Sequence, residues 1–205
     1  MITPDAVLSW PDLFVAKAQN EGEKPKFSAT LVFLPGTDLK DMKVAALDAL
    51  METFKLTKKE ALAGVADGSL KWPFLDDAAK IEKKGYPEGS TAVNVKTYKR
   101  PGIVSIFPDP NTGKPMPIND PEEASYGAVV MVSVNPFAFD KKGNKGVSFW
   151  MNNLQVRGRS DVLGGGGKAA ADEFDADPSA VADLADIEAP TEDVEGGTDL
   201  DSLLS

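Results

Sequence analysis

The stretch Thr91-Ala92-Val93-Asn94-Val95-Lys96-Thr97-Tyr98-Lys99-Arg100 alternates between apolar and polar side chains. Because successive side chains of a strand point to opposite faces, the stretch is predicted to be a β-strand. One face would carry Val93, Val95 and Thr97 toward a core. The other face would carry Asn94, Lys96, Tyr98 and Arg100, which places an aromatic ring between two cations.

Strand-like segments occur on both sides of this stretch. They are rich in Val, Ile and aromatic residues and are separated by turn-forming residues. We expect strands at residues 5–10 (ending at Pro11), 26–34, 102–107, 126–135 and 145–156. Together with residues 91–100 they make about six strands.

Helical spacing of apolar residues appears between the second and third strands. Residues 39–54 repeat apolar side chains as one face of a helix does, after a cap near Thr37 or Asp38. Thr57-Lys58-Lys59-Glu60 is a capping box, which predicts a second, shorter helix. The fold class expected is therefore mostly β: an OB-fold-like antiparallel barrel with a helical insertion, followed by a disordered acidic C-terminal tail.

Charge divides the chain into two parts. All 22 basic residues precede residue 169, whereas 12 of the 32 acidic residues follow it. The run Gly164–Gly167 favours no single conformation. We therefore expect an OB-fold domain over residues 1–163, and a Gly-rich linker with a disordered acidic tail over residues 164–205.

The chain contains neither Cys nor His, and their absence excludes several classes of enzyme and metal site. Without Cys there is no disulfide, thiolate nucleophile or zinc–thiolate site, and without His the commonest general base and metal ligand are missing. We expect a binding protein rather than an enzyme, with no catalytic residue, metal or cofactor. No apolar stretch approaches the length of a membrane span and no secretory signal is evident, so a cytoplasmic location is the default.

Basic and aromatic residues indicate the ligand. We expect Lys96, Tyr98 and Arg100 to form the centre of a nucleic-acid-binding site, with outer contacts from Trp72, Lys142 and Lys145. Rings can stack on bases of any sequence while cations hold the phosphates, and no recognition helix for a duplex groove is evident. Single strands are the favoured ligand. A solvated strand face is the alternative, and aromatic residues such as Phe137, Phe139, Phe149 and Trp150 are more often core residues than ligand contacts.

The tail has its own predicted role. A flexible chain of this length spans on the order of 35 Å, enough to reach a cationic groove on the body and compete with phosphate. Its tip would be gripped by a partner protein through Asp199, Asp201, Leu203 and Leu204. The alternative is a solubilising tail without a partner.

The run from Asn94 to Gly102, with Ser125-Tyr-Gly-Ala-Val-Val, Val134-Asn-Pro-Phe-Ala-Phe and Lys145-Gly-Val-Ser-Phe, resembles the single-stranded DNA-binding proteins of tailed bacteriophages. The resemblance covers roughly residues 5–160. It implies an OB-fold, sequence-independent binding of single-stranded DNA, and a role in phage replication, recombination or repair inside the host cell. It also implies DNA contacts by Lys96, Tyr98 and Arg100. Many such tails end in an aromatic residue, whereas this chain ends Leu203-Leu204-Ser205.

Two other functions stay open. One is an OB-like protein-interaction adaptor that grips an acidic protein segment. The other is a magnesium nuclease using Asp76 and Asp77, although a helix start is the simpler interpretation of that pair. The sequence leaves the choice between a monomer and a homodimer open. The predicted protein partners are replication or recombination proteins. No association with a membrane is predicted.

Overall fold

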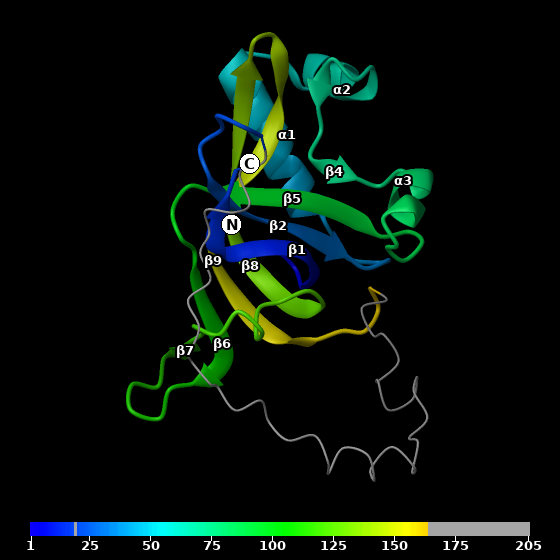
Figure 1. The fold of residues 1–205 in the computed structure, drawn as a ribbon. Helices are drawn as coiled ribbons and strands as arrows, with labels where there is room; N and C mark the ends of the chain where they lie inside the picture. Colours follow the sequence, from blue (N-terminus) through cyan, green and yellow to red (C-terminus); the bar gives the residue numbers. More distant parts are fainter. Residues whose placement is uncertain (19, 164–205) are drawn as a thin grey trace, which may run out of the picture. The chain divides into compact units, whose positions relative to one another are not determined.

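The structure is a computed structural model and describes residues 1–18 and 20–163; the predicted linker and tail lie outside the described residues. Strands and helices follow one another along the chain as shown in Figure 1. Their bounds are β1 Ala6–Lys17, β2 Lys26–Phe33, α1 Lys40–Phe54, α2 Lys58–Ala66, β3 Leu70–Lys71, β4 Phe74–Leu75, α3 Ala78–Lys83, β5 Thr91–Thr97, β6 Gly102–Pro108, β7 Pro115–Pro117, β8 Ala128–Lys141 and β9 Asn144–Arg159.

Five strands pair into a ring. β2 lies antiparallel between β1 and β5, and β8 lies antiparallel between β1 and β9. The ring closes where β5 runs parallel to β9, through the pairs Val95↔Phe149 and Lys96↔Trp150. This confirms the mostly β, OB-fold-like architecture, which is a partly open five-stranded arrangement. Because only two residue pairs close the ring, and they are parallel, the sheet is ring-like rather than a fully paired antiparallel barrel.

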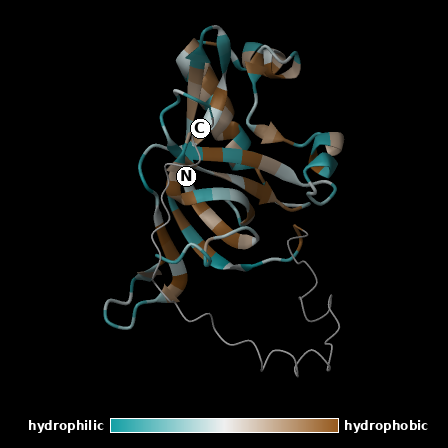
Figure 2. Ribbon diagram, viewed as in Figure 1, coloured by the Kyte–Doolittle hydropathy of each residue, from teal (hydrophilic) through white to brown (hydrophobic). Residues whose placement is uncertain are grey.

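The main core fills the inside of the ring, as the alternation of the strands predicts. Ala29, Leu31 and Phe33 of β2 and Val93 and Val95 of β5 are buried there. The predicted helical insertion is confirmed, and α1 contributes its buried face of Met42, Ala46, Leu47 and Leu50. Each fully buried Leu or Phe side chain stabilises the fold by about 1.5–3 kcal/mol. Figure 2 shows hydrophobic and hydrophilic residues alternating along the strands of the ring.

A bulge replaces the predicted end of the first strand. β1 continues through Pro11 to Lys17, and Ser9↔Thr30 is followed by Asp12↔Ser28, so β1 has one residue more than β2 in this interval. Trp10 adopts φ +48° at this point. The prediction that the strand ends at Pro11 is wrong because a bulge accommodates a residue that cannot donate to the ladder.

Helix capping follows the sequence closely. Thr57 Oγ1 accepts from the Glu60 amide while Glu60 accepts from the Thr57 amide, which confirms the capping box. Asp77 caps α3 by accepting from the Lys80 amide, as expected for a helix start. Ile81 of α3 and Tyr86 after it belong to a smaller second core, and the Tyr86 hydroxyl donates to Ser9 Oγ at 2.9 Å. Tyr86 is therefore not available to a ligand.

Candidate nucleic-acid interface

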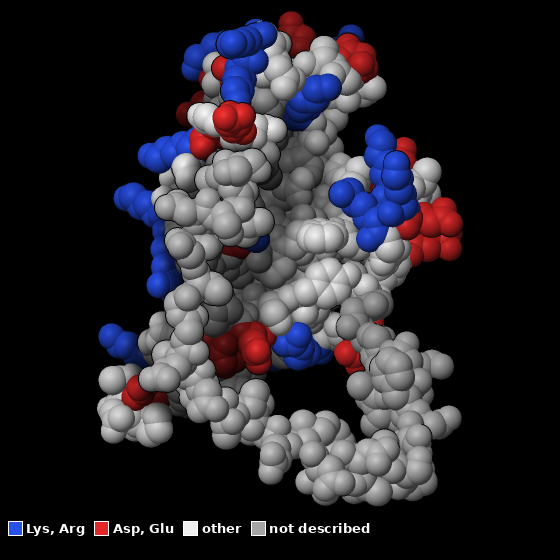
Figure 3. Space-filling model, in the orientation of Figure 1, with Lys and Arg blue, Asp and Glu red and all other residues white. Residues whose placement is uncertain are grey.

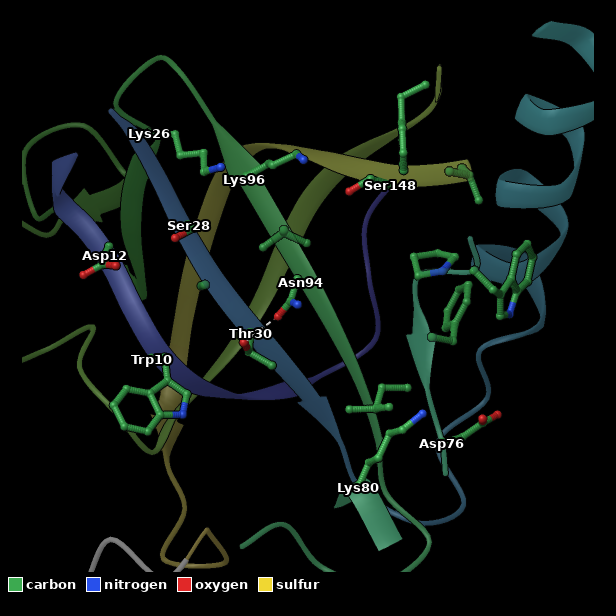
Figure 4. A pocket seen from close by; sticks show the side chains of 18 of the residues that line it. Trp10, Asp12, Lys26, Ser28, Thr30, Asp76, Lys80, Asn94, Lys96 and Ser148 are labelled. Carbon is green, nitrogen blue, oxygen red and sulfur yellow. Dashed lines mark hydrogen bonds between the residues drawn. The ribbon is translucent and has the colours of Figure 1, made fainter. Parts of the chain in front are cut away.

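An open trough runs across β2 and β5, the second and third strands of the ring. In OB-folds the face of these two strands binds the ligand. Its cavity volume is about 750 Å³. The floor is made of short polar side chains, since Thr30 Oγ1 donates to Asn94 Oδ1 at 2.7 Å beside Ser28 and Ser148. Figure 4 shows Lys26 and Lys96 at one end of this floor and Trp10, Asp76 and Lys80 toward the other. In Figure 3 the same face is hollowed and carries Lys and Arg along its margins, including a group over α3.

A second cavity of about 510 Å³ extends the trough past Lys96. It lies between the β1–β2 loop, which supplies Glu23 and Lys24, and the β8–β9 hairpin, which supplies Lys141. The two cavities share Lys26, Lys96 and Phe139. They therefore form one trough, and the name is used below for both. These two loops are also the ones that flank the ligand in OB-folds.

Four aromatic rings stand in a row along this extension of the trough. Tyr98 and Trp150 have ring centroids 5.5 Å apart, Trp150 stacks on Phe137 at 4.3 Å and 14°, and Phe139 follows at 6.4 Å. Strand pairing explains the row. Phe137 pairs with Ser148, so Trp150 is its diagonal neighbour on the same face. Tyr98 is 49% exposed, so a face of the row is open to a ligand.

Lysines flank this aromatic row. Lys96 Nζ lies 5.7 Å from the Phe137 ring and 5.9 Å from the Trp150 ring, and Lys24 Nζ lies 5.1 Å from the Tyr98 ring. Burial among the rings lowers the pKa of Lys96, and the neighbouring charges of Lys26 and Lys141 lower it further. Glu23 partly offsets them, since its carboxylate lies 3.7 Å from both Lys26 and Lys141. An anion such as phosphate would relieve the same repulsion.

Two more indoles line the trough outside the aromatic row. Trp10, placed by the β1 bulge, is 74% exposed. Trp72 forms part of the wall, with its ring 5.2 Å from Phe74. All three tryptophans of the chain, including Trp150, therefore line the trough.

The structure brings some of the sequence-predicted site residues together and separates others. Lys96, Tyr98 and Trp72 line the trough. Arg100 does not, because β5 ends at Thr97, and its guanidinium lies 5.5 Å from the Phe14 ring. The prediction that Asn94, Lys96, Tyr98 and Arg100 share one face is therefore wrong for Arg100.

The β8–β9 hairpin separates the remaining predicted cations. Lys145 Nζ lies 5.3 Å from the Phe54 ring of α1 and 3.9 Å from Asp140. Lys142, with φ +55°, forms the exposed tip of the hairpin. Neither lines the trough, whereas their neighbour Lys141 does.

Several trough residues were missed by the sequence reasoning. Lys26, Ser28 and Thr30 could have been found, because they occupy the polar face of an alternating strand. Phe137, Phe139, Phe149 and Trp150 were expected in the core more than at a ligand; of these four the structure buries Phe149 and places the other three at the trough. Trp10 and Lys24 had no local signal, whereas Lys141 belongs to the lysine-rich turn 140–146 from which only Lys142 and Lys145 were predicted as contacts.

The nuclease alternative finds no support in this geometry. Asp77 is occupied in capping α3. Among residues 1–18 and 20–163, no group of three or more acidic side chains is placed to hold a metal ion.

No helix among the described residues is both long and apolar enough to cross a membrane.

Comparison with known proteins identifies the family of the chain. The family described as "Enterobacter phage Enc34, ssDNA-binding protein" matches residues 1–185. The chain belongs to this family. Its members are binding proteins, which confirms the prediction that the chain is not an enzyme and the suspected relationship to phage single-stranded DNA-binding proteins.

Solved structures from the Enc34 protein share the fold. The single-stranded DNA-binding protein from bacteriophage Enc34 in complex with ssDNA has a TM-score of 0.54 at 21% identity, over 78% of this chain and 86% of that one. A second structure, of the single-stranded DNA-binding protein from bacteriophage Enc34, has a TM-score of 0.53 at 20% identity, over 85% of this chain and 89% of that one. No curated protein sequence matches the chain.

Proposed function

We propose that this protein binds single-stranded DNA, without sequence preference, along the trough. The observation that carries the proposal is the row of four rings beside a cluster of lysines in the extension of the trough. Every base has a π-face, and stacking on a ring contributes about 1–3 kcal/mol per base by alanine substitution. Lys24, Lys26, Lys96 and Lys141 would hold the backbone phosphates between the stacked bases.

The family supports this ligand, since an Enc34 member of the same fold has been solved with ssDNA. We further propose a role in phage DNA replication, recombination or repair in the cytoplasm of the host cell. The acidic tail would compete with DNA and recruit replication or recombination proteins through Asp199, Asp201, Leu203 and Leu204. Arg100, Lys142 and Lys145 stay predicted as outer contacts to the strand.

The proposal is tested by titrating short labelled oligonucleotides of dT, dC and mixed sequence, about 12 nucleotides long, within the range that one OB-fold covers. Combining Tyr98→Ala with Trp150→Ala should lower the affinity for all three alike, by about 30- to 1000-fold if each ring contributes 1–2 kcal/mol. Trp fluorescence of the unmodified protein should be quenched on binding.

Phe107→Ala is the matched control, because this ring is 67% exposed but lies outside the trough. It should leave the affinity for short oligonucleotides unchanged. A loss confined to one sequence would argue against stacking. No appreciable binding by the unmodified protein would refute the proposal and favour the protein-interaction adaptor.

A further inference from the structure

A hairpin outside the trough presents apolar side chains to solvent. It is formed by β6 and β7, where Ile106, Phe107 and Met116 are 40%, 67% and 41% exposed. β7 begins and ends with Pro115 and Pro117, which cannot donate to another strand. A partner would therefore meet this hairpin through side chains rather than by extending the sheet.

A groove elsewhere on the molecule has matching chemistry. It has a volume of about 530 Å³, and its apolar lining is Leu39 just before α1, Val44 and Leu47 of α1, Leu62 of α2, and Trp72. Val44 and Leu62 are each 49% exposed. Exposed apolar surface of this kind on both the hairpin and the groove is typical of interaction sites.

The hairpin and the groove lie apart. In Figure 1 the β6–β7 hairpin projects from one side of the ring, and α1 and α2 lie on the opposite side. A copy of the protein therefore cannot place its own hairpin in its own groove, but a neighbouring copy can reach it. Charges of both signs are present on each surface and can pair between copies, since Asp38, Lys40 and Lys43 line the groove and Asp109 and Lys114 lie in the hairpin turn.

We propose that the β6–β7 hairpin of one copy docks in the α1–α2 groove of the next copy on the same DNA strand. This inference rests on the proposed function. A single strand has one chemical direction, so copies bound to it in the same way point the same way. A head-to-tail contact then repeats along the strand, whereas a two-fold contact closes after two copies.

The position of Trp72 connects this contact to DNA. Its side chain lines both the groove and the trough. A hairpin seated in the groove would lie against the wall that holds the DNA, which places neighbouring copies side by side on the strand. Docking should therefore make binding to long single strands cooperative.

The test compares dT oligonucleotides of about 12 and about 60 nucleotides, which accommodate one and several copies. The unmodified protein should bind the long strand at least about tenfold more tightly per site, because the neighbour contact acts within one complex. At low protein concentration, gel shifts should show bare and filled strands together. Phe107→Glu and Leu62→Glu should each abolish this clustering and leave the short-strand affinity unchanged.

A charge exchange and a matched control complete the test. Combining Phe107→Glu with Leu62→Lys in one chain should restore clustering, because each new Glu meets a Lys of the neighbour. Ile2→Glu, at a residue 65% exposed and outside both surfaces, should leave clustering intact. Melting curves check that each variant is folded.

Three results would overturn the inference: clustering absent from the unmodified protein, clustering retained by Phe107→Glu, or clustering lost equally in Ile2→Glu. Retention in Leu62→Glu together with loss in Phe107→Glu would also reject it, because that pattern indicates hairpin-to-hairpin pairs. The short strand distinguishes the two proposals. Its failure to bind refutes the function itself, whereas short-strand binding without clustering refutes only the neighbour contact.

Discussion

Lys96 has the least ordinary surroundings of any trough cation. Rings of Phe137 and Trp150 cover it, and Lys26 and Lys141 repel it, so that its pKa is lowered. Without a ligand, the charged form is disfavoured in the folded chain relative to the unfolded chain. This residue therefore costs stability at neutral pH, and the stability rises as pH rises through the lowered pKa. Such an arrangement is typical of a site built for an absent counter-charge.

At this residue we predict opposite effects on stability and on binding. Lys96→Met should raise the free energy of unfolding by up to about 1 kcal/mol, since an apolar side chain suits the rings. The same change should reduce the log–log salt slope of single-strand binding by about 0.7, the share of one phosphate. Thermal melting and oligo(dT) titrations across a salt series measure the two effects. Lys59→Met on α2 should change neither.

The pH dependence provides an independent check on the same residue. Because Lys96 loses its proton at a lower pH than an ordinary lysine, the affinity for oligo(dT) should fall as pH rises from neutral toward about 10. Lys96→Arg should flatten this fall, since a guanidinium stays charged throughout. An identical pH profile for the two proteins would mean that Lys96 does not contact phosphate.

Among the elements, β1 contains an unusual bulge. Trp10 lies there at φ +48° and its side chain is 74% exposed. Both the left-handed backbone and the high exposure are unusual for a large aromatic residue in a strand. A non-glycine residue in this conformation costs of order 1–3 kcal/mol. The bulge turns the indole into the end of the trough opposite the aromatic row. This combination is expected where a ring serves a ligand rather than the fold.

For this bulge we predict that Trp10→Gly leaves the free energy of unfolding unchanged or raises it by up to about 2 kcal/mol. The relief of the left-handed backbone offsets the entropy that glycine costs, about 0.5–1 kcal/mol. Val15→Gly is the matched control, since Val15 is 68% exposed on the same strand and lies outside that conformation. It should destabilise the protein by about 1 kcal/mol. Urea unfolding measures both.

Binding separates the backbone from the ring at the same position. Trp10→Gly should weaken the affinity for oligo(dT) by about 5- to 100-fold, the contribution of one stacked base. Trp10→Phe should retain most of it. An unchanged affinity in Trp10→Gly would indicate that the bulge backbone, and not the ring, is what DNA requires.

At the scale of the whole molecule, charge is the deciding property. Residues 1–168 contain all 22 bases, and residues 169–205 contain 12 acids and no base. A tethered polyanion has an effective concentration near its own body in the millimolar range. On this basis we propose that it competes with phosphate for the lysines of the trough, most strongly at low salt.

Deleting residues 169–205 should tighten binding to oligo(dT) on the order of tenfold at low ionic strength, and less as salt screens the competition. Titrations at two salt concentrations measure this. A tail of the same length with each Asp and Glu replaced by Asn and Gln is the control, and it should behave as the deletion does. Unchanged affinity after deletion would remove the competitor role.

Local patterns predicted much of this protein. Alternation identified β2 and β5 with their buried faces, and a four-residue signature identified the start of α2. The same alternation placed Lys96 and Tyr98 on one face. It failed at Arg100, because β5 ends at Thr97 before Pro101, where the Lys99 amide bonds to Thr97 Oγ1 instead of to a neighbouring strand.

Strand pairing, by contrast, was decided only in three dimensions. Trp150 meets Lys96 because β9 closes the ring against β5, and Lys141 reaches the trough because the hairpin register directs it there. Residues 96 and 150 are far apart in sequence, and no local periodicity encodes which strands become neighbours. Side-chain alternation is a property of one strand and can be read from its residues, whereas a binding surface that several strands share depends on how the whole chain packs.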